Sequence, residues 1–264
     1  MSPERVTDVT IHRGATPLIR LAQKPGAVGP FFYRPGAGAT AMKHESFHES
    51  AEMYLKTASE LAGENTPTPI AALAGRLGVS AVSATEMVHR LQEQGLLAHQ
   101  PYRGISLTAA GQQLADEVVR RHRLWECFLY ERLGLPWHEV HDHACRLEHA
   151  TTPAVTEALD AFLGHPAACP HGNPIDGQAG EPAERLLSEL PVGGTAVLVR
   201  VHPESEGLLC YLAELDLLPG RRITLREIAP YQGPMVLQTD VGVRYIGREA
   251  AAHVHIRLLT EEPA

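Results

Sequence analysis

Apolar positions near the start of the chain recur with the spacing of an α-helix. Between residues 45 and 61, Met53, Tyr54, Ala58 and Leu61 fall on one side of a 3.6-residue period. A glycine and two prolines follow and would end the segment. The pattern therefore predicts a helix over residues 45–61, preceded by a stretch rich in turn-forming residues that shows no period.

The next segment has the pattern of two short helices followed by a hairpin. Residues 70–77 and 82–94 are amphipathic, and the sequence Gly-Val-Ser between them suits a turn followed by a helix-capping serine. Two short apolar segments, 96–99 and 105–107, flank a Tyr-Arg-Gly turn. This order predicts a helix-turn-helix with a two-stranded wing.

Helical periodicity resumes at residue 108 and continues to about residue 163, where a loop dense in glycine and proline begins. Beyond this loop, strand-forming composition recurs around one further helical segment at 206–217. The strand-like segments are 195–202, 221–228, 235–240 and 253–259. The fold class predicted is mainly α, with a small C-terminal β-barrel of SH3-like size.

Composition narrows the possible functions. The formal net charge of −8 excludes a uniformly basic nucleic-acid binder, so any DNA contact must come from a local patch. Residues 66–123 supply one, with six arginines against four acidic residues. The four cysteines are scattered without a close pair, and no apolar run approaches 18 residues. We expect a cytoplasmic protein with reduced thiols, neither secreted nor bound to a membrane.

The start of the second helix and the tip of the wing hold the candidate DNA-binding residues. Side chains there would hydrogen-bond to base edges or pack on thymine methyl groups in the major groove, and the wing arginine would contact phosphate. The alternative is a helical hairpin used only for packing or protein contacts. The candidates are Ser80, Ala81, Val82, Ser83, Ala84, Thr85, Glu86 and Arg103.

Metal-ligand side chains are concentrated in the sequence VHDHACRLEHA at residues 140–150. On a continuous helix, Cys145, Glu148 and His149 would share one face, with His141 one turn earlier. His122 and Glu126 repeat the i, i+4 spacing on the preceding helix, and Met53 lies on the first helix. Two metal sites could thus form between three helices. We interpret His143 as a solvated bystander, and the Cys-Pro-His sequence at 169–171 as turn chemistry.

Several of these motifs together resemble the diphtheria toxin repressor family of iron- and manganese-dependent regulators. The similarity covers residues 45–175 and rests on EMYLKT, the helix-turn-helix, RHRLWE, VHDHACRLEH and CPHGNPI. The resemblance implies a primary metal site made by Met53, Cys145, Glu148 and His149. It implies an ancillary site made by His122, Glu126 and His141, with further ligands from the SH3-like domain. For these we expect Glu204 first, then His202 or Glu206.

Composition and the resemblance together predict a domain order, in which the N-terminal extension departs from the family's usual pattern, and the resemblance implies a function. We expect a flexible extension (1–41), a winged helix-turn-helix (42–110), a helical metal-binding and dimerisation domain (111–168), a linker (169–190) and an SH3-like, FeoA-like domain (191–264). The function implied is a homodimer that binds palindromic operator DNA when Mn²⁺ or Fe²⁺ fills two sites per chain, and so represses metal-uptake genes. The alternatives are a dinuclear metal-dependent hydrolase and a metal buffer protein.

Overall fold

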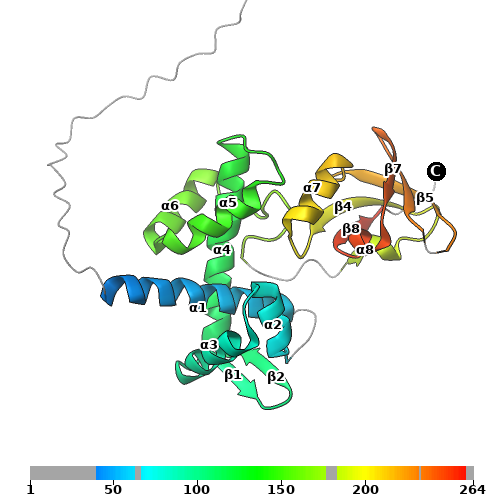
Figure 1. Ribbon diagram of the computed structural model, residues 1–264. Coiled ribbons are helices and arrows are strands. Elements are labelled where there is room, and N and C mark those ends of the chain that lie inside the picture. The colour runs from blue at the N-terminus through cyan, green and yellow to red at the C-terminus, as the bar shows by residue number, and fades with distance from the viewer. Residues whose placement is uncertain (1–39, 63–66, 177–182, 232, 260–264) are drawn as a thin grey trace, which may run out of the picture.

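The computed structural model describes residues 40–62, 67–176, 183–231 and 233–259. The first unit combines three helices with a two-stranded antiparallel sheet (Figure 1). Its elements are α1 (Thr40–Ala62), α2 (Ile70–Leu77), α3 (Ala81–Glu93), β1 (Leu97–Gln100) and β2 (Gly104–Leu107). The helix-turn-helix and its wing are confirmed. Of the predicted N-terminal extension, residues 1–39 lie outside the described residues, and α1 begins at Thr40.

Local chemistry explains the turn between α2 and α3. Helix α2 ends at Gly78, whose φ of 66° is the left-handed conformation that glycine adopts without steric cost. Ser80 then caps α3, its hydroxyl accepting a hydrogen bond of 3.1 Å from the backbone N–H of Ser83. These two residues fix where one helix stops and the next begins.

The wing is attached at β2 and at the residue that precedes β1. Gly104 has a φ of 121°, and a Cβ added there would collide with the carbonyl of Thr68. At this point Thr68 and Ile105 exchange two backbone hydrogen bonds of 2.8 Å. On the other side, Gly111 of the following helix packs so closely on Leu96 that an added Cβ would collide with its carbonyl oxygen. The wing is therefore held against both the segment before α2 and the helix that follows it.

That helix, α4 (Ala109–Glu131), links the first unit to a second group of helices (Figure 1). The second group is α5 (Val140–Leu147), η1 (Glu148–Ala150) and α6 (Pro153–Leu163). A continuous helix carrying Cys145, Glu148 and His149 was expected, and this is wrong: the α-helix ends at Leu147 and a 3-10 turn follows. The next helix starts immediately with Thr152 as its cap and a proline in its first turn, so α5 has no room to continue.

The C-terminal unit is a six-stranded antiparallel sheet in the order β3-β8-β4-β5-β6-β7. It confirms the small β domain, although two of its strands, β3 and β7, were not predicted, and β3 falls within the expected linker. Its elements are β3 (Glu184–Leu186), η2 (Leu187–Glu189), β4 (Thr195–Val201), α7 (Glu206–Glu214), β5 (Arg222–Ile228), β6 (Met235–Thr239), β7 (Gly242–Ile246), α8 (Arg248–Ala251) and β8 (Val254–Leu258).

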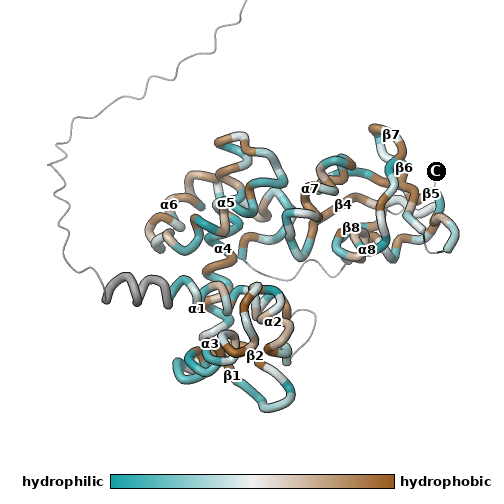
Figure 2. The backbone as a smooth tube through the Cα atoms, in the orientation of Figure 1, coloured by the Kyte–Doolittle hydropathy of each residue, from teal (hydrophilic) through white to brown (hydrophobic). Residues whose placement is uncertain are grey.

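Separate apolar cores hold these units together, and α4 contributes buried residues to three of them. Ala115 packs with Leu73 and Leu91 in the core of the winged unit, while Leu124 packs with Leu159 of α6. In Figure 2, hydrophobic and hydrophilic stretches alternate along the helices and strands. Within the described part of the chain, no helix has both the length and the hydropathy needed to cross a membrane.

Candidate functional site

The metal-type residues predicted from the sequence surround one cavity. It has a volume of about 600 Å³ and lies between α1, α4, α5 and the loop that joins β4 to α7. The fully buried Glu126 does not line it but contacts two of the residues that do. The predicted residues that line the cavity are Met53, His122, His141, Cys145, Glu148, His149, His202 and Glu204.

Four side chains of the metal-ligand type lie close together and form one cluster. His122 and Glu126 lie one turn apart on α4, His141 lies in the first turn of α5, and Glu204 lies in the loop before α7. Nε2 of His122 is 2.9 Å from Oε1 of Glu126, and Nδ1 of His141 is 3.0 Å from Oε2 of Glu204. The four ligand atoms all lie within 4.8 Å of one another. The residues expected for the ancillary set, Glu204 included, are therefore close together.

The electrostatics of this cluster suit a divalent cation. Burial alone would raise the pKa of Glu126, but the imidazoles of His171 and His122 lower it well below its usual range. Burial would likewise lower the pKa of His141, yet its hydrogen bonds to Cys145, Glu126 and Glu204 raise it to about 11. The carboxylates and the imidazoles of this cluster thus favour one another's charged forms.

One carboxylate oxygen in the cluster lacks a partner. Oε2 of Glu126 is buried and makes no hydrogen bond among the described residues. Buried anionic oxygens are normally paired with a donor, so this atom is an acceptor left open. Imidazole nitrogens together with carboxylate oxygens are a donor set that fits first-row divalent cations such as Mn²⁺, Fe²⁺ and Zn²⁺. The residues present therefore fit a bound metal ion.

The turn at residues 169–171 contributes a histidine that sequence reasoning missed. His171 is fully buried, with Nδ1 3.1 Å from Oε1 of Glu126 and Nε2 3.0 Å from the carbonyl of Trp137. Ligand atoms of Cys169, His171, Glu126 and Glu204 also lie within 4.8 Å of one another. The Cys-X-His spacing in this glycine-rich turn was the available signal, and interpreting it as turn chemistry alone overlooked a second group around the same two carboxylates.

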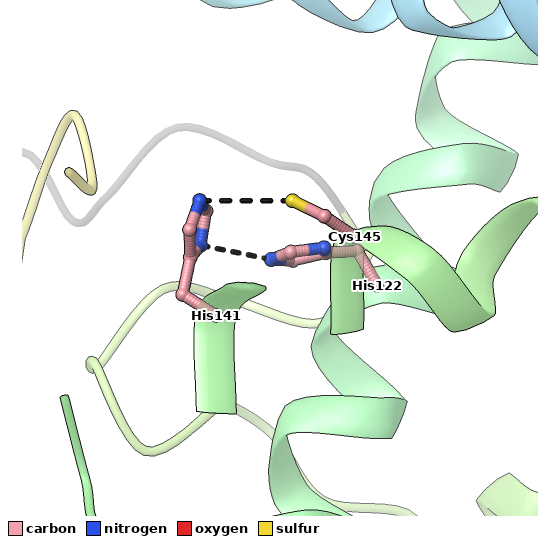
Figure 3. Close-up of side chains that lie close together, drawn as sticks. All are labelled: His122, His141 and Cys145. Carbon is pink, nitrogen blue, oxygen red and sulfur yellow. Dashed lines mark hydrogen bonds between the residues drawn. The ribbon is translucent and has the colours of Figure 1, made fainter. Parts of the chain in front are cut away.

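Cys145 points toward the histidines of this cluster. Its Sγ lies 3.8 Å from Nε2 of His141, whose Nδ1 is 3.2 Å from Nε2 of His122 (Figure 3). Ligand atoms of the three residues lie within 4.8 Å of one another. Burial would raise the pKa of Cys145, but hydrogen bonds with the two histidines and the nearby charge of Lys56 lower it to about 6. The thiol is thus prepared to act as a thiolate donor.

Of the other residues expected for the primary site, Glu148 and His149 each contact a further ionisable side chain of the protein. Oε2 of Glu148 lies 2.6 Å from Nδ1 of His122, and Nδ1 of His149 lies 2.7 Å from Oε2 of Glu52. The pKa of Glu148 falls to about 2, because His122 and Lys56 outweigh the effect of burial, which would raise it. Met53, 43% exposed, lines the same cavity.

Glu52 joins three elements beside the cavity. Its carboxylate on α1 lies 2.7 Å from Nδ1 of His149 in η1 and accepts a 2.6 Å hydrogen bond from Arg121 of α4. Burial would raise the pKa of Glu52, but these two partners lower it. The arrangement connects α1, which belongs to the winged unit, directly to a predicted metal ligand.

Three further histidine and acidic residues of the sequence have different surroundings. His202 lines the cavity, and burial lowers its pKa to about 4, which leaves the imidazole neutral. It belongs to none of the three groups of convergent ligand atoms found among the described residues. Glu206 is exposed as the first residue of α7, and His143 is exposed on α5.

The predicted DNA-binding residues gather at the N-terminal end of α3 and in the wing. Val82 is 70% exposed, and Arg103 is exposed in the turn between β1 and β2. Ala84 was expected to face DNA, and this is wrong, because it is fully buried in the core of the winged unit. Thr85 is half-buried, and its hydroxyl donates to the carbonyl of Ala81. The exposed candidates on α3 and its cap are Ser80, Ala81, Val82, Ser83 and Glu86.

Three protein families match the chain in sequence order. The family described as "Iron dependent repressor, N-terminal DNA binding domain" matches residues 46–105. The family described as "Iron dependent repressor, metal binding and dimerisation domain" matches residues 108–177. The FeoA domain matches residues 185–258. The matches thus cover the winged unit, the helical unit and the sheet.

Individual proteins are also similar to the chain over much of its length. The iron-dependent repressor IdeR of Mycobacterium tuberculosis is 35% identical over 204 residues, which cover 72% of this chain and 88% of the relative. The diphtheria toxin repressor of Corynebacterium jeikeium is 41% identical over 129 residues, 49% of this chain and 54% of the relative. Among solved structures, a manganese-dependent transcriptional repressor in complex with manganese matches with a TM-score of 0.71 and 35% identity, covering 79% of this chain and 100% of that chain.

Proposed function

Because the chain belongs to the family of iron-dependent repressors, we propose that it is a transcriptional repressor whose affinity for operator DNA depends on a bound divalent cation. The observation that carries the proposal is the position of α4. This helix supplies His122 and Glu126 to the ligand cluster and Ala115 to the core of the winged unit. Metal binding and the orientation of the DNA-binding surface therefore share one rigid element.

We propose two cation sites per chain. Met53, Cys145, Glu148 and His149 would hold the activating ion, and this assignment rests on the shared cavity and on the family resemblance. Glu126 and Glu204 would hold the ancillary ion, together with His122 and His141. Cys169 and His171 offer the same carboxylates a second pair of donors.

The cation is proposed to be Fe²⁺ or Mn²⁺, with iron favoured. Met53 and Cys145 provide sulfur donors, and sulfur suits Fe²⁺ better than Mn²⁺, which prefers carboxylate and water oxygen. The ancillary cluster, built from imidazoles and carboxylates, accepts either ion. A divalent ion held by this cluster would supply positive charge that offsets the buried carboxylates. An ion at the activating site would join Met53 of α1 to Cys145 of α5 and to η1.

A site of this kind can supply the free energy needed to couple ion binding to the DNA-binding conformation. Converting a population with 1% of the DNA-binding conformation into one with 99% takes about a 10⁴-fold preference of the ion for that conformation, roughly 5.5 kcal/mol. Glu52, which joins α1 to Arg121 and His149, would transmit the arrangement of the ligands to the winged unit.

We propose further that the protein acts as a homodimer on a palindromic operator. A two-fold dimer presents two recognition helices to two half-sites related by the same symmetry. Control of metal-uptake genes is the role that fits a regulator sensing the transported ion. The relatives matched are transcriptional regulators, which favours this function over the hydrolase and metal-buffer alternatives.

Fluorescence anisotropy tests the proposal directly. A labelled duplex from the region upstream of the chain's own coding sequence is titrated with protein, with Mn²⁺ or anaerobic Fe²⁺ and again with chelator. We expect tight binding only with the ion, loss of the stimulation in Glu148→Ala and His149→Ala, and its retention in His143→Ala, which alters an exposed side chain on the same segment. DNA affinity that chelator leaves unchanged would refute the metal dependence.

A further inference from the structure

A buried lysine lies against a carboxylate predicted to bind the activating ion. Nζ of Lys56, on α1, is 3.1 Å from Oε1 and 2.8 Å from Oε2 of Glu148. The side chain of Lys56 is 11% exposed and that of Glu148 only 2% exposed. The ammonium therefore contacts both oxygens of this carboxylate away from bulk water.

The lysine is unusual in its own sequence. The chain contains three lysines, Lys24, Lys43 and Lys56, against twenty arginines. An arginine carries a broad planar group with fixed donor directions, whereas an ammonium is a compact point charge that occupies the volume of a small cation. At Glu148 the chain thus carries its own small cation on a flexible stem.

Within the described part of the chain, the Glu148 carboxylate also lies close to two imidazoles. Oε2 lies 2.6 Å from Nδ1 of His122, and Oε1 lies 3.3 Å from Nε2 of His149. Together with Lys56, these groups occupy the oxygens through which Glu148 would bind a metal ion. A divalent ion that used the carboxylate would have to lie beside the ammonium, and two cations at such a distance repel strongly in a buried site.

We propose that Lys56 is a tethered cation that competes with the activating metal ion for Glu148 and so raises the metal concentration at which the protein responds. This inference rests on the proposed function. Because Lys56 belongs to α1 of the winged unit and Glu148 to η1 of the helical unit, exchange of the ammonium for the ion breaks one link between the two units. The competition thereby couples metal binding to the position of α1.

The released ammonium has a second carboxylate within reach. Glu60 lies four residues further along α1, the spacing at which side chains on a helix meet. Together with Glu148 and Cys145, its charge contributes to the raised pKa of Lys56, against burial, which acts in the opposite direction. Transfer of Lys56 from Glu148 toward Glu60 keeps the ammonium paired while Glu148 becomes free to bind the ion.

Chemical labelling of the wild-type chain tests the displacement without any mutation. The protein is treated briefly with an amine-acetylating reagent, with and without saturating Mn²⁺, and acetylation at each lysine is measured by mass spectrometry. Lys24 and Lys43 serve as internal references. We expect acetylation of Lys56 to rise several-fold relative to the references when Mn²⁺ is present. An unchanged or lower ratio would overturn the proposal.

Substitution of Lys56 tests the competition. In isothermal titration with Mn²⁺, Lys56→Met should lower the Kd of the activating site by about tenfold, equivalent to about 1.4 kcal/mol, because the competing charge is removed. Lys56→Arg retains the charge and should keep a Kd at or above that of the wild type. Equal Kd values for the wild type and Lys56→Met would refute the proposal, and should Lys56→Met fail to fold, the labelling result decides. A wild-type chain that binds no Mn²⁺ or Fe²⁺ refutes the proposed function itself, an outcome separate from either of these.

Discussion

Replacing Glu126 with glutamine removes one negative charge from the centre of the ligand cluster while keeping the shape of the side chain. Oε1 of Glu126 lies 2.9 Å from His122, 3.3 Å from His141 and 3.1 Å from His171, and the residue is fully buried. An amide cannot balance the charge of protonated imidazoles. The substitution therefore leaves buried positive charge without its main partner.

The expected loss of stability follows from this geometry. Removing one partner of a buried charged pair costs about 3–5 kcal/mol. Deprotonation of a histidine can relieve part of the cost, since each unit of pKa shift corresponds to about 1.36 kcal/mol. For domains of roughly this size, 1 kcal/mol shifts the melting temperature by about 2–4 °C. We expect the metal-free Glu126→Gln protein to melt about 6–20 °C below the wild type.

Calorimetry in chelator measures this difference, and titration with Mn²⁺ measures the accompanying loss of the ancillary ion. Glu131→Gln is the matched control, because Glu131 is an exposed residue at the end of the same helix and should leave both quantities unchanged. A Glu126→Gln protein with wild-type melting temperature and wild-type metal stoichiometry would refute the reasoning that Glu126 is the central charge of the site.

Three other expectations follow from the same structure. The pKa of His141 is raised to about 11, so its proton stabilises the metal-free fold fully below its ordinary pKa of 6.5, and this contribution is lost as pH rises toward 11. Ion binding at neutral pH must therefore release protons and strengthen with rising pH, and calorimetry in two buffers of different ionisation enthalpy would contradict this if no protons were released. Gly104→Ala should lower stability by about 1–3 kcal/mol, because a Cβ at a φ of 121° collides with Thr68; an unchanged urea midpoint would show that the wing tolerates the collision. Val82→Glu places a negative charge on a side chain that is 70% exposed at the start of α3, and should abolish DNA binding while leaving the free energy of unfolding within about 0.5 kcal/mol of the wild-type value; retained operator affinity would exclude this surface from the DNA interface.

Local chemistry made the winged unit and the helical spacing predictable. The capping serine, the glycine after α2 and the Tyr-Arg-Gly turn act over a few residues, so the sequence alone locates them. The same holds for His122 and Glu126, which are neighbours because both lie on one helix. The end of α5 at Leu147 was not predictable in this way. The pattern of side chains continues past it, but the cap and the proline of α6 follow too soon for the helix to extend.

Contacts of the site between residues far apart in the sequence could not be predicted from local patterns. His171 and Glu204 approach Glu126 only because two loops meet over α4, and Lys56 meets Glu148 across 92 positions of sequence. Ala84 fits the polar and small pattern expected of a DNA-facing residue, but the rotation of α3 buries it. In each case the outcome depends on how elements pack, which hydrophobic period alone does not specify.

The close packing of Gly111 on Leu96 has a consequence for how DNA is selected. Because Leu96 at the base of the wing packs on Gly111 and accepts a hydrogen bond from Thr108, we expect the wing to follow the tilt of its own α4. In a two-fold dimer, a tilt of α4 in each chain changes the separation of the two winged units by the sum of both movements. The two half-sites on the duplex, in contrast, stay about 34 Å apart. Metal binding would then act by changing the distance between the two winged units, and not by altering the surface of each unit that contacts bases. A duplex carrying a single half-site should accordingly bind the metal-free and metal-loaded chains with equal affinity.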